Sequence, residues 1–342
     1  MSNAPAQPRI TWHTVVVVAL TGGLLWWFLR KLDFANVGRA IASAHLSFVA
    51  AAVLVTFQTY VIRAWRWQLL LLPLGRARFR TAFRTTVIGF TASFLLPGRV
   101  GEVLRPYLLA RQENMNAAAA FATVIVERVL DMVSVLLLFA VFLFTTSIDV
   151  GRELRVGGAV AAGVAVAALI VMALSAGHPE RLGRWAGRIT RLLPGRAAEI
   201  ASRFVRTFAE GLAVMRRPTA LFGSFALSLL LWLSIALGIW FSSLALDLTF
   251  SFPGSFLLLM YLVVGVAVPV PAGVGSFHAM YQDATTRFFG APIDVAAAAA
   301  IVLHAVSFVP ISIFGLVLMA QDGLTIGGLK DLKATAQEAE KS

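Results

Sequence analysis

The chain has 342 residues, of which 59% are hydrophobic and 13% are charged, and its mean hydropathy is +0.82. No soluble domain of this size stays dispersed with that composition, so the sequence predicts an integral membrane protein. The absence of cysteine excludes disulfides, thiolate metal sites and cysteine nucleophiles. The formal net charge of +12 lies largely in loops between apolar runs, which argues against nucleic-acid binding and points to membrane topology.

Six apolar runs are long enough to cross a hydrocarbon core of about 30 Å, which takes roughly 20 helical residues. They lie near residues 12–29, 47–72, 118–145, 156–175, 219–246 and 294–320. The first could be a secretory signal, but Leu29-Arg30-Lys31 follows it instead of a small-residue cleavage site. We therefore expect a retained anchor. Near the inner end of the second run, Arg63 and Arg66 stand beside Trp65 and Trp67, a pattern more typical of an interfacial anchor belt than of a site.

A Pro/Gly segment interrupts residues 85–110, which follow the second run. It reads Leu96-Pro97-Gly98-Arg99-Val100-Gly101-Glu102. Four basic residues precede it and favour a cytoplasmic start: Arg76, Arg78, Arg80 and Arg84. The loop that follows is also expected in the cytoplasm, so this stretch enters and leaves the membrane on one side. We predict a re-entrant hairpin with Pro97 and Gly98 near its tip.

Arg99, Glu102 and Arg105 lie close to this break and are candidate substrate-binding residues. A half-helix that starts after Gly101 would point its positive end at an anion, for which a phosphodiester is the natural ligand. The alternative is that Arg99 and Arg105 are ordinary interfacial residues whose charged ends reach the head-group region.

The third apolar run contains the strongest cluster of ionisable residues, Glu127-Arg128-x-x-Asp131. Such residues inside a membrane segment are costly and by default suggest function. Glu127 and Asp131 are four residues apart on one helix face, and Arg128 can pair with Asp131. One hypothesis is that Arg128 contacts an anionic head group while the carboxylates position it or bind a cationic substituent or proton. The other is a self-neutralising pair that locks neighbouring helices.

The loop at 177–217 is rich in arginine and is expected to be cytoplasmic. The loop contains nine arginines and only three glutamates. The arginines are Arg181, Arg184, Arg188, Arg191, Arg196, Arg203, Arg206, Arg216 and Arg217, and the glutamates are Glu180, Glu199 and Glu210. Apolar residues recur within it at helical spacing. The loop is either an interfacial helix on an anionic leaflet or a basic segment that only sets orientation.

A second break, Pro269-Val270-Pro271-Ala272-Gly273-Val274-Gly275, lies within residues 254–290, about 174 residues after the first. We predict a second hairpin that enters from the external side. The residues expected to break the two hairpins are Pro97, Gly98, Gly101, Pro269, Pro271, Gly273 and Gly275. His278 follows this break and His304 lies in the last run. Each histidine is either a buried core residue whose hydrogen bonds are satisfied or a switch that responds to protonation. His304 is kept as a candidate substrate-binding residue.

These elements predict an all-α polytopic membrane protein with about six to eight transmembrane helices and two opposed re-entrant hairpins in an inverted repeat. Residues 1–325 form one membrane domain, with halves at about 10–146 and 156–320, and residues 326–342 form a polar tail. Both termini are expected in the cytoplasm. Signatures of soluble catalytic sites, such as Gly-x-x-x-x-Gly-Lys, His-Glu-x-x-His and Gly-x-Ser-x-Gly, are absent from the sequence, so no cofactor or metal is expected.

Three motifs together resemble the lysylphosphatidylglycerol synthase transmembrane-region family, flippase-like proteins of UPF0104 type. They are Leu95 to Glu102 with Arg105, Val126 to Arg128 with Asp131, and Pro269 to Gly275. In two-part members of that family the membrane domain is implicated in moving an aminoacylated phospholipid, and a separate domain synthesises it. This chain resembles the membrane part and lacks room for the synthase. It departs from the pattern at Ser276, where glutamate is common.

The resemblance and the residues together predict a lipid translocase of the bacterial inner membrane, without enzymatic activity, that binds an anionic or aminoacylated phospholipid or a polyprenyl-linked lipid. A polar site at the midplane would bind the head group. The alternatives are a polytopic transferase for a lipid-linked sugar or amino acid, with Glu127 or Asp131 as base, and a non-catalytic partner of an envelope enzyme.

Overall fold

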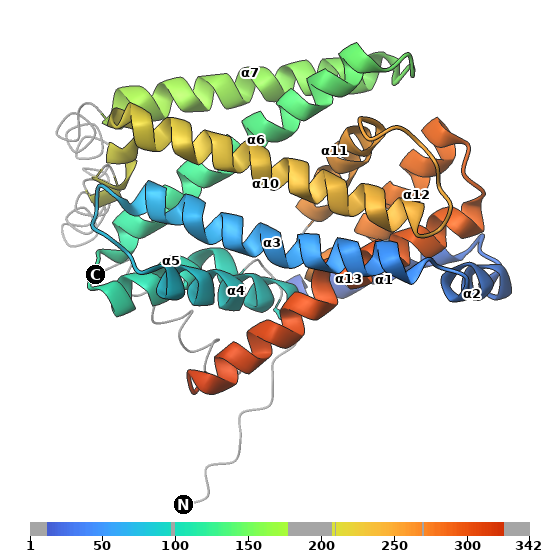
Figure 1. The fold of residues 1–342 in the computed structure, drawn as a ribbon, viewed down its shortest axis with the longest axis horizontal. Coiled ribbons are helices and arrows are strands. Elements are labelled where there is room, and N and C mark those ends of the chain that lie inside the picture. Colours follow the sequence, from blue (N-terminus) through green and yellow to red (C-terminus); the bar gives the residue numbers. More distant parts are fainter. Residues whose placement is uncertain (1–11, 97–99, 177–206, 209, 269, 325–342) are drawn as a thin grey trace, which may run out of the picture.

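The computed structural model describes residues 12–96, 100–176, 207–208, 210–268 and 270–324, with side chains omitted at 12–18 and 175–176. All regular structure in these ranges is helical, and its long helices run side by side (Figure 1). They are α3 (Leu46–Leu71), α6 (Ala117–Thr145), α7 (Gly151–Ala176), α10 (Pro218–Leu244) and α13 (Ile293–Gln321). By length and composition, four described helices could cross a membrane: α3, α7 up to Leu174, α10 and α13. The prediction of an all-α polytopic membrane protein is confirmed.

Helix boundaries follow the predicted apolar runs to within two residues, with one exception. Helix α7 begins at Gly151, five residues before the expected start at 156, because its first turn is polar and lies outside the apolar run. The Asp149 carboxylate accepts a hydrogen bond from the backbone N–H of Gly151 at 3.0 Å and pairs with Arg155 at 2.9 Å. Hydropathy detects only the apolar part of such a helix.

Helix α1 (Trp12–Leu29) is followed by a short helix that the apolar runs do not predict, α2 (Phe34–Ala42). Asp33 begins α2 as its N-cap, since its carboxylate accepts hydrogen bonds from the backbone N–H groups of the first turn. The carboxylate of Asp294, at the start of α13, accepts from the Asp33 backbone N–H at 3.0 Å and from Asn36 Nδ2 at 3.1 Å. Helix α2 is therefore fixed to the second half of the chain.

The first hairpin consists of α4 (Phe79–Leu95) and α5 (Gly101–Glu113). Leu96 leaves the helix in an extended conformation, as expected for a residue that precedes proline. The two arms pack backbone to backbone, because a Cβ atom at Gly101 would overlap the carbonyl group of Gly89. The Gly101 N–H donates to Ser93 Oγ at 3.0 Å. At 1.5 Å per residue the arms are roughly 25 and 20 Å long, too short to span a bilayer separately.

The second hairpin consists of α11 (Gly254–Ala267), the 3₁₀ turn η2 (Pro271–Gly273) and α12 (Ser276–Phe289). Its break requires left-handed backbone, with φ of +68° at Gly273 and +86° at Gly275. Gly275 also lies against α1: a Cβ atom there would come within 2.9 Å of the backbone nitrogen of Leu25.

The two hairpins approach each other from opposite ends of the bundle, α4 and α5 from one end and α11 and α12 from the other (Figure 1). The first hairpin contacts the second, because α4 packs against η2. Helix α4 also contacts α13, where Thr91 packs directly against Gly315. Helices α3 and α10 pack along their length. The order of elements is the same in both halves, with two long helices, a hairpin and another long helix. The symmetry of an inverted repeat stays a prediction.

The turn η1 (Leu212–Arg216) leads into α10. Several features singled out in the sequence lie outside the described residues: Pro97, Gly98, Arg99, Pro269, most of the arginine-rich loop and the polar tail.

Candidate functional site

Two buried carboxylates on α6 form the centre of the polar cluster. Glu127 is fully buried and Asp131 is 4% exposed. Glu127 lies roughly 15 Å along α6 from Ala117 at 1.5 Å per residue, well inside this 29-residue helix. Their spacing of four residues puts both side chains on the face of α6 that meets α3, α5 and α10.

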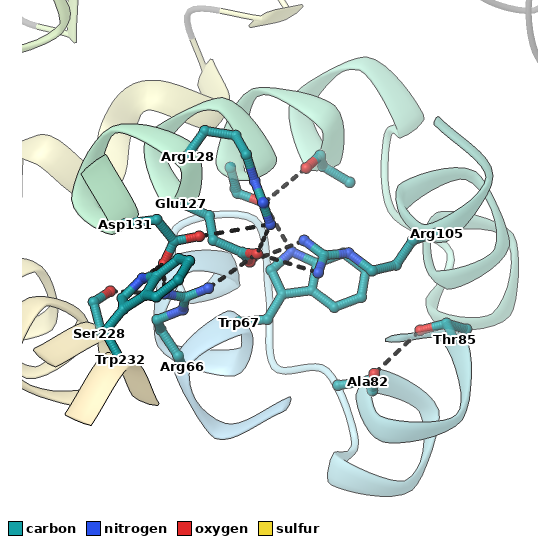
Figure 2. A network of polar contacts seen from close by, with 12 residues as sticks. Arg66, Trp67, Ala82, Thr85, Arg105, Glu127, Arg128, Asp131, Ser228 and Trp232 are labelled. Atoms are coloured by element: carbon teal, nitrogen blue, oxygen red, sulfur yellow. Dashed lines mark hydrogen bonds and ion pairs between the residues drawn. The ribbon is translucent and has the colours of Figure 1, made fainter. Parts of the chain in front are cut away.

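Arg66 on α3 is paired with both carboxylates (Figure 2). Its Nη2 atom lies 3.0 Å from Glu127 Oε1, and its Nη1 atom contacts Asp131 Oδ1 and donates to Ser228 Oγ on α10 at 2.8 Å. The side chain is fully buried. The interpretation of Arg66 as an interfacial anchor is therefore wrong. Helix α6 carries two carboxylates, Glu127 and Asp131, but only one neighbouring arginine, Arg128. This charge imbalance predicts a cation from another helix, and it is the signal in the sequence that could have identified Arg66.

Arg105, on the returning arm of the first hairpin, forms a two-point contact with Glu127. Its Nη2 lies 2.9 Å from Oε2, and its Nη1 lies 3.3 Å from Oε1. The guanidinium group stacks 4.3 Å above the ring of Trp67, whose Nε1 donates to Thr123 Oγ1 at 3.0 Å. Arg105 is only 3% exposed, so it is part of the interior and not an interfacial residue.

Arg128 completes the cluster from the same helix as the carboxylates. Its Nη2 atom lies 2.7 Å from Glu127 Oε1 and 3.6 Å from Asp131 Oδ2, so the local ion pair expected from the sequence is present. Asp131 also accepts a hydrogen bond from Trp232 Nε1 on α10 at 2.8 Å. Unlike Arg66 and Arg105, Arg128 retains 36% exposure of its side chain. It is the arginine of this network that a ligand can reach most readily.

A cavity of about 150 Å³ lies between the breaks of the two hairpins. Its charged lining consists of Glu102, Arg105 and Arg128. The second hairpin supplies apolar side chains and backbone. The remaining lining residues are Gly89, Phe90, Ser93, Phe94, Gly101, Val124, Val266, Val270, Ala272, Gly273 and Phe308. Both breaks predicted from the sequence thus border one cavity, whose charged side chains come from α5 and α6.

His304 supports the break of the second hairpin. Its Nε2 atom donates to the carbonyl oxygen of Ala272 at 3.0 Å, and its ring stacks 4.4 Å from Phe308, a lining residue of the cavity. The ring of His278 lies 4.6 Å from that of His304. His304 therefore contacts two lining residues of the cavity, Ala272 and Phe308, without itself belonging to the lining. Within the described ranges, no cluster of three or more His, Asp or Glu side chains is placed to hold a metal ion.

Comparison with known proteins gives a family match over most of the chain. The model of the family described as lysylphosphatidylglycerol synthase TM region matches residues 14–315. Glycosyltransferase AglD of Haloferax volcanii is 27% identical over 343 aligned residues, which cover 88% of this chain and 53% of that protein. The UPF0104 membrane protein MJ1595 of Methanocaldococcus jannaschii is 26% identical over 146 residues, 42% of this chain and 41% of that protein. The chain spans about half the length of these curated relatives or less.

Proposed function

The chain belongs to the lysylphosphatidylglycerol synthase TM region family, and on that premise we propose that it moves a phospholipid across the bilayer with the head group held between its two hairpins. The observation that carries the proposal is the cavity at the two breaks, which is lined by two arginines, Arg105 and Arg128, and one carboxylate, Glu102. A charge in bare hydrocarbon costs about 3 kcal/mol or more. A polar passage for the head group removes much of that cost while the acyl chains stay in lipid.

The charge of the site favours an anionic head group over an aminoacylated one. Four guanidinium groups, those of Arg63, Arg66, Arg105 and Arg128, stand near three carboxylates, those of Glu102, Glu127 and Asp131. One positive charge is left over in the described part of the cluster. A phosphodiester supplies one negative charge and neutralises it. An aminoacyl group would add positive charge, and the second hairpin has Ser276 where the family pattern often has glutamate.

The arrangement of the hairpins suggests how the cavity opens. Broken helices that meet near the midplane from opposite ends are the usual architecture of a site with alternating access. Relative rocking of the two halves would expose the cavity first to one leaflet and then to the other. The basic residues between α3 and α4 favour a cytoplasmic location for that end of the bundle. The protein would then lie in a bacterial inner membrane with both termini inside.

Replacing Arg128 by glutamine is expected to slow translocation of an anionic lipid roughly ten- to hundredfold, because a hydrogen bond to a charged group contributes about 1.5–3 kcal/mol. The measurement uses proteoliposomes with fluorescent phosphatidylglycerol, phosphatidylcholine or lysyl-phosphatidylglycerol, and dithionite to quench the outer leaflet. Wild type should move phosphatidylglycerol fastest.

The matched control is Arg155→Gln, which removes an exposed arginine paired with Asp149 at the start of α7. It should translocate lipid like wild type. If folded wild-type protein moves none of the three lipids, or if Arg128→Gln moves phosphatidylglycerol at the wild-type rate, the proposal is wrong.

A second candidate is a transferase that acts on a lipid-linked sugar, favoured by the name of one relative, Glycosyltransferase AglD. The chain covers only 53% of that protein, so the named activity can reside in the unmatched part. The transferase would use Glu127 or Asp131 as base. Mass spectrometry of a lipid-linked acceptor incubated with the purified protein and a sugar donor decides the matter, since a transferase changes the mass and a translocase does not.

A further inference from the structure

Arg63 on α3 is a buried arginine that forms no direct ion pair with any described carboxylate. It lies one helical turn before Arg66 and is 9% exposed. Its Nε atom is sealed from solvent and has no hydrogen-bond partner. Within the described residues, no carboxylate oxygen comes within 4.0 Å of its guanidinium group. What surrounds it instead is aromatic: the Phe90 ring at 4.6 Å and the Tyr60 ring at 5.9 Å.

The other buried arginines differ from Arg63 in this respect. Arg66 contacts Glu127 and Asp131, and Arg105 contacts Glu127 at two points. The cation–π contacts of a guanidinium group are weak compared with the cost of burying a charge that has no ion-pair partner. The packing around Arg63 therefore does not offset its burial. A charge retained in a membrane helix without a partner is expected to have a ligand.

The position of Arg63 relates it to the cavity. Phe90 is a lining residue of the cavity, and its ring centroid lies 4.6 Å from the guanidinium carbon of Arg63 and 6.0 Å from that of Arg105. The aromatic ring thus lies close to both arginines, and Arg63 is not itself part of the lining. Phe90 therefore belongs both to the surroundings of Arg63 and to the lining of the cavity that Arg105 and Arg128 border.

We propose that Arg63 is a second phosphate-binding residue on the lipid path, which receives the anionic phosphate of the head group from the cavity when the Phe90 ring moves aside. The inference rests on the proposed function, since it adds a second position for the same ligand. The chemistry recognised is that of phosphate oxygens, either in a phosphodiester lipid or in free phosphate. Guanidinium groups are well suited to it because they donate in a planar fork.

The decisive variant is Arg63→Gln, examined for both stability and transport. Because the substitution removes a buried charge that has no ion-pair partner, the thermal unfolding midpoint in detergent should stay at the wild-type value or rise. Translocation of fluorescent phosphatidylglycerol should fall at least tenfold, and Arg63→Lys should retain part of the rate. A purely structural role for Arg63 predicts the opposite, a lower midpoint. Arg66→Gln provides that comparison, since it leaves Glu127 and Asp131 short of a partner.

Binding is measured separately, as the shift of the wild-type unfolding midpoint by phosphatidylglycerol micelles and by inorganic phosphate, with Arg155→Gln as control. A shift by either probe that is smaller in Arg63→Gln supports the inference, and a shift by the lipid alone identifies the lipid as the source of the phosphate. Equal shifts in wild type and Arg63→Gln, or equal translocation rates, overturn it. If wild type translocates no lipid, the proposed function fails, and the binding shifts alone decide the role of Arg63.

Discussion

Replacing Glu127 by glutamine is expected to destabilise the helix bundle by about 3–5 kcal/mol, the usual effect of removing one partner of a buried ion pair. One carboxylate here contacts three arginines on three helices: Arg66 on α3, Arg105 on α5 and Arg128 on α6. Glutamine fits the space but leaves these guanidinium groups with Asp131 as their nearest remaining counter-charge. The midpoint of thermal unfolding in detergent should fall sharply, and the yield of folded protein should fall with it.

Glu153→Gln is the matched control for this change. Glu153 lies in the exposed first turn of α7, so its replacement should leave the unfolding midpoint unchanged. The double variant Glu127→Gln with Arg105→Met should recover part of the lost stability, since it removes one of the uncompensated charges. Equal midpoints for Glu127→Gln and Glu153→Gln would show that the network contributes nothing to folding.

Replacing Gly101 by valine is expected to separate the two arms of the first hairpin. Any Cβ atom at this position overlaps the Gly89 carbonyl group and approaches the Ser93 hydroxyl, and both atoms belong to a tightly packed neighbouring helix. Overpacking of a core typically costs about 1–3 kcal/mol and sometimes more. Because Gly89, Ser93 and Gly101 all line the cavity, the shift should also abolish lipid translocation in the proteoliposome assay.

Gly157→Val tests whether this result depends on the close helix contact. Gly157 lies within α7, and a Cβ atom there would meet nothing within 4 Å. The same substitution at this position should change neither the unfolding midpoint nor the translocation rate. If Gly101→Val were as stable and as active as Gly157→Val, the close packing of α4 on α5 would not be needed.

The sequence predicted the long helices well because their apolar runs exceed the length that a bilayer requires. It missed features whose signal is local and polar. Helix α2 depends on Asp33 as its cap, and the first turn of α7 depends on Asp149. Helix α2 has only nine residues, and the first turn of α7 is mostly polar, so neither forms an apolar run long enough for hydropathy to detect. To predict where helices begin and end at the polar ends of a membrane protein, one therefore needs the positions of individual capping residues, which a hydropathy average does not retain.

The candidate site could be predicted from the sequence only in part. Glu127, Arg128 and Asp131 stand out because they are charged within an apolar run. Arg66 was assigned to the membrane interface because tryptophans flank it, yet Trp65 is 51% exposed and Trp67 is fully buried. Adjacent residues on a helix face different surroundings, and the sequence does not specify how α3 is rotated about its axis. For the same reason Ser228 and Trp232 on α10 gave no signal before the helices were packed.

The sharing of one carboxylate by three arginines has a consequence for how this protein can diverge. A lineage that loses Glu127 is left with several unneutralised cations in its interior, and a lineage that loses one arginine upsets the balance in the other direction. Residues 66, 105 and 127 are therefore expected to change in concert, through paired replacements, when relatives are compared. Such covariation would record the ion-pair network in sequences alone, and its absence would indicate that each charge can drift independently.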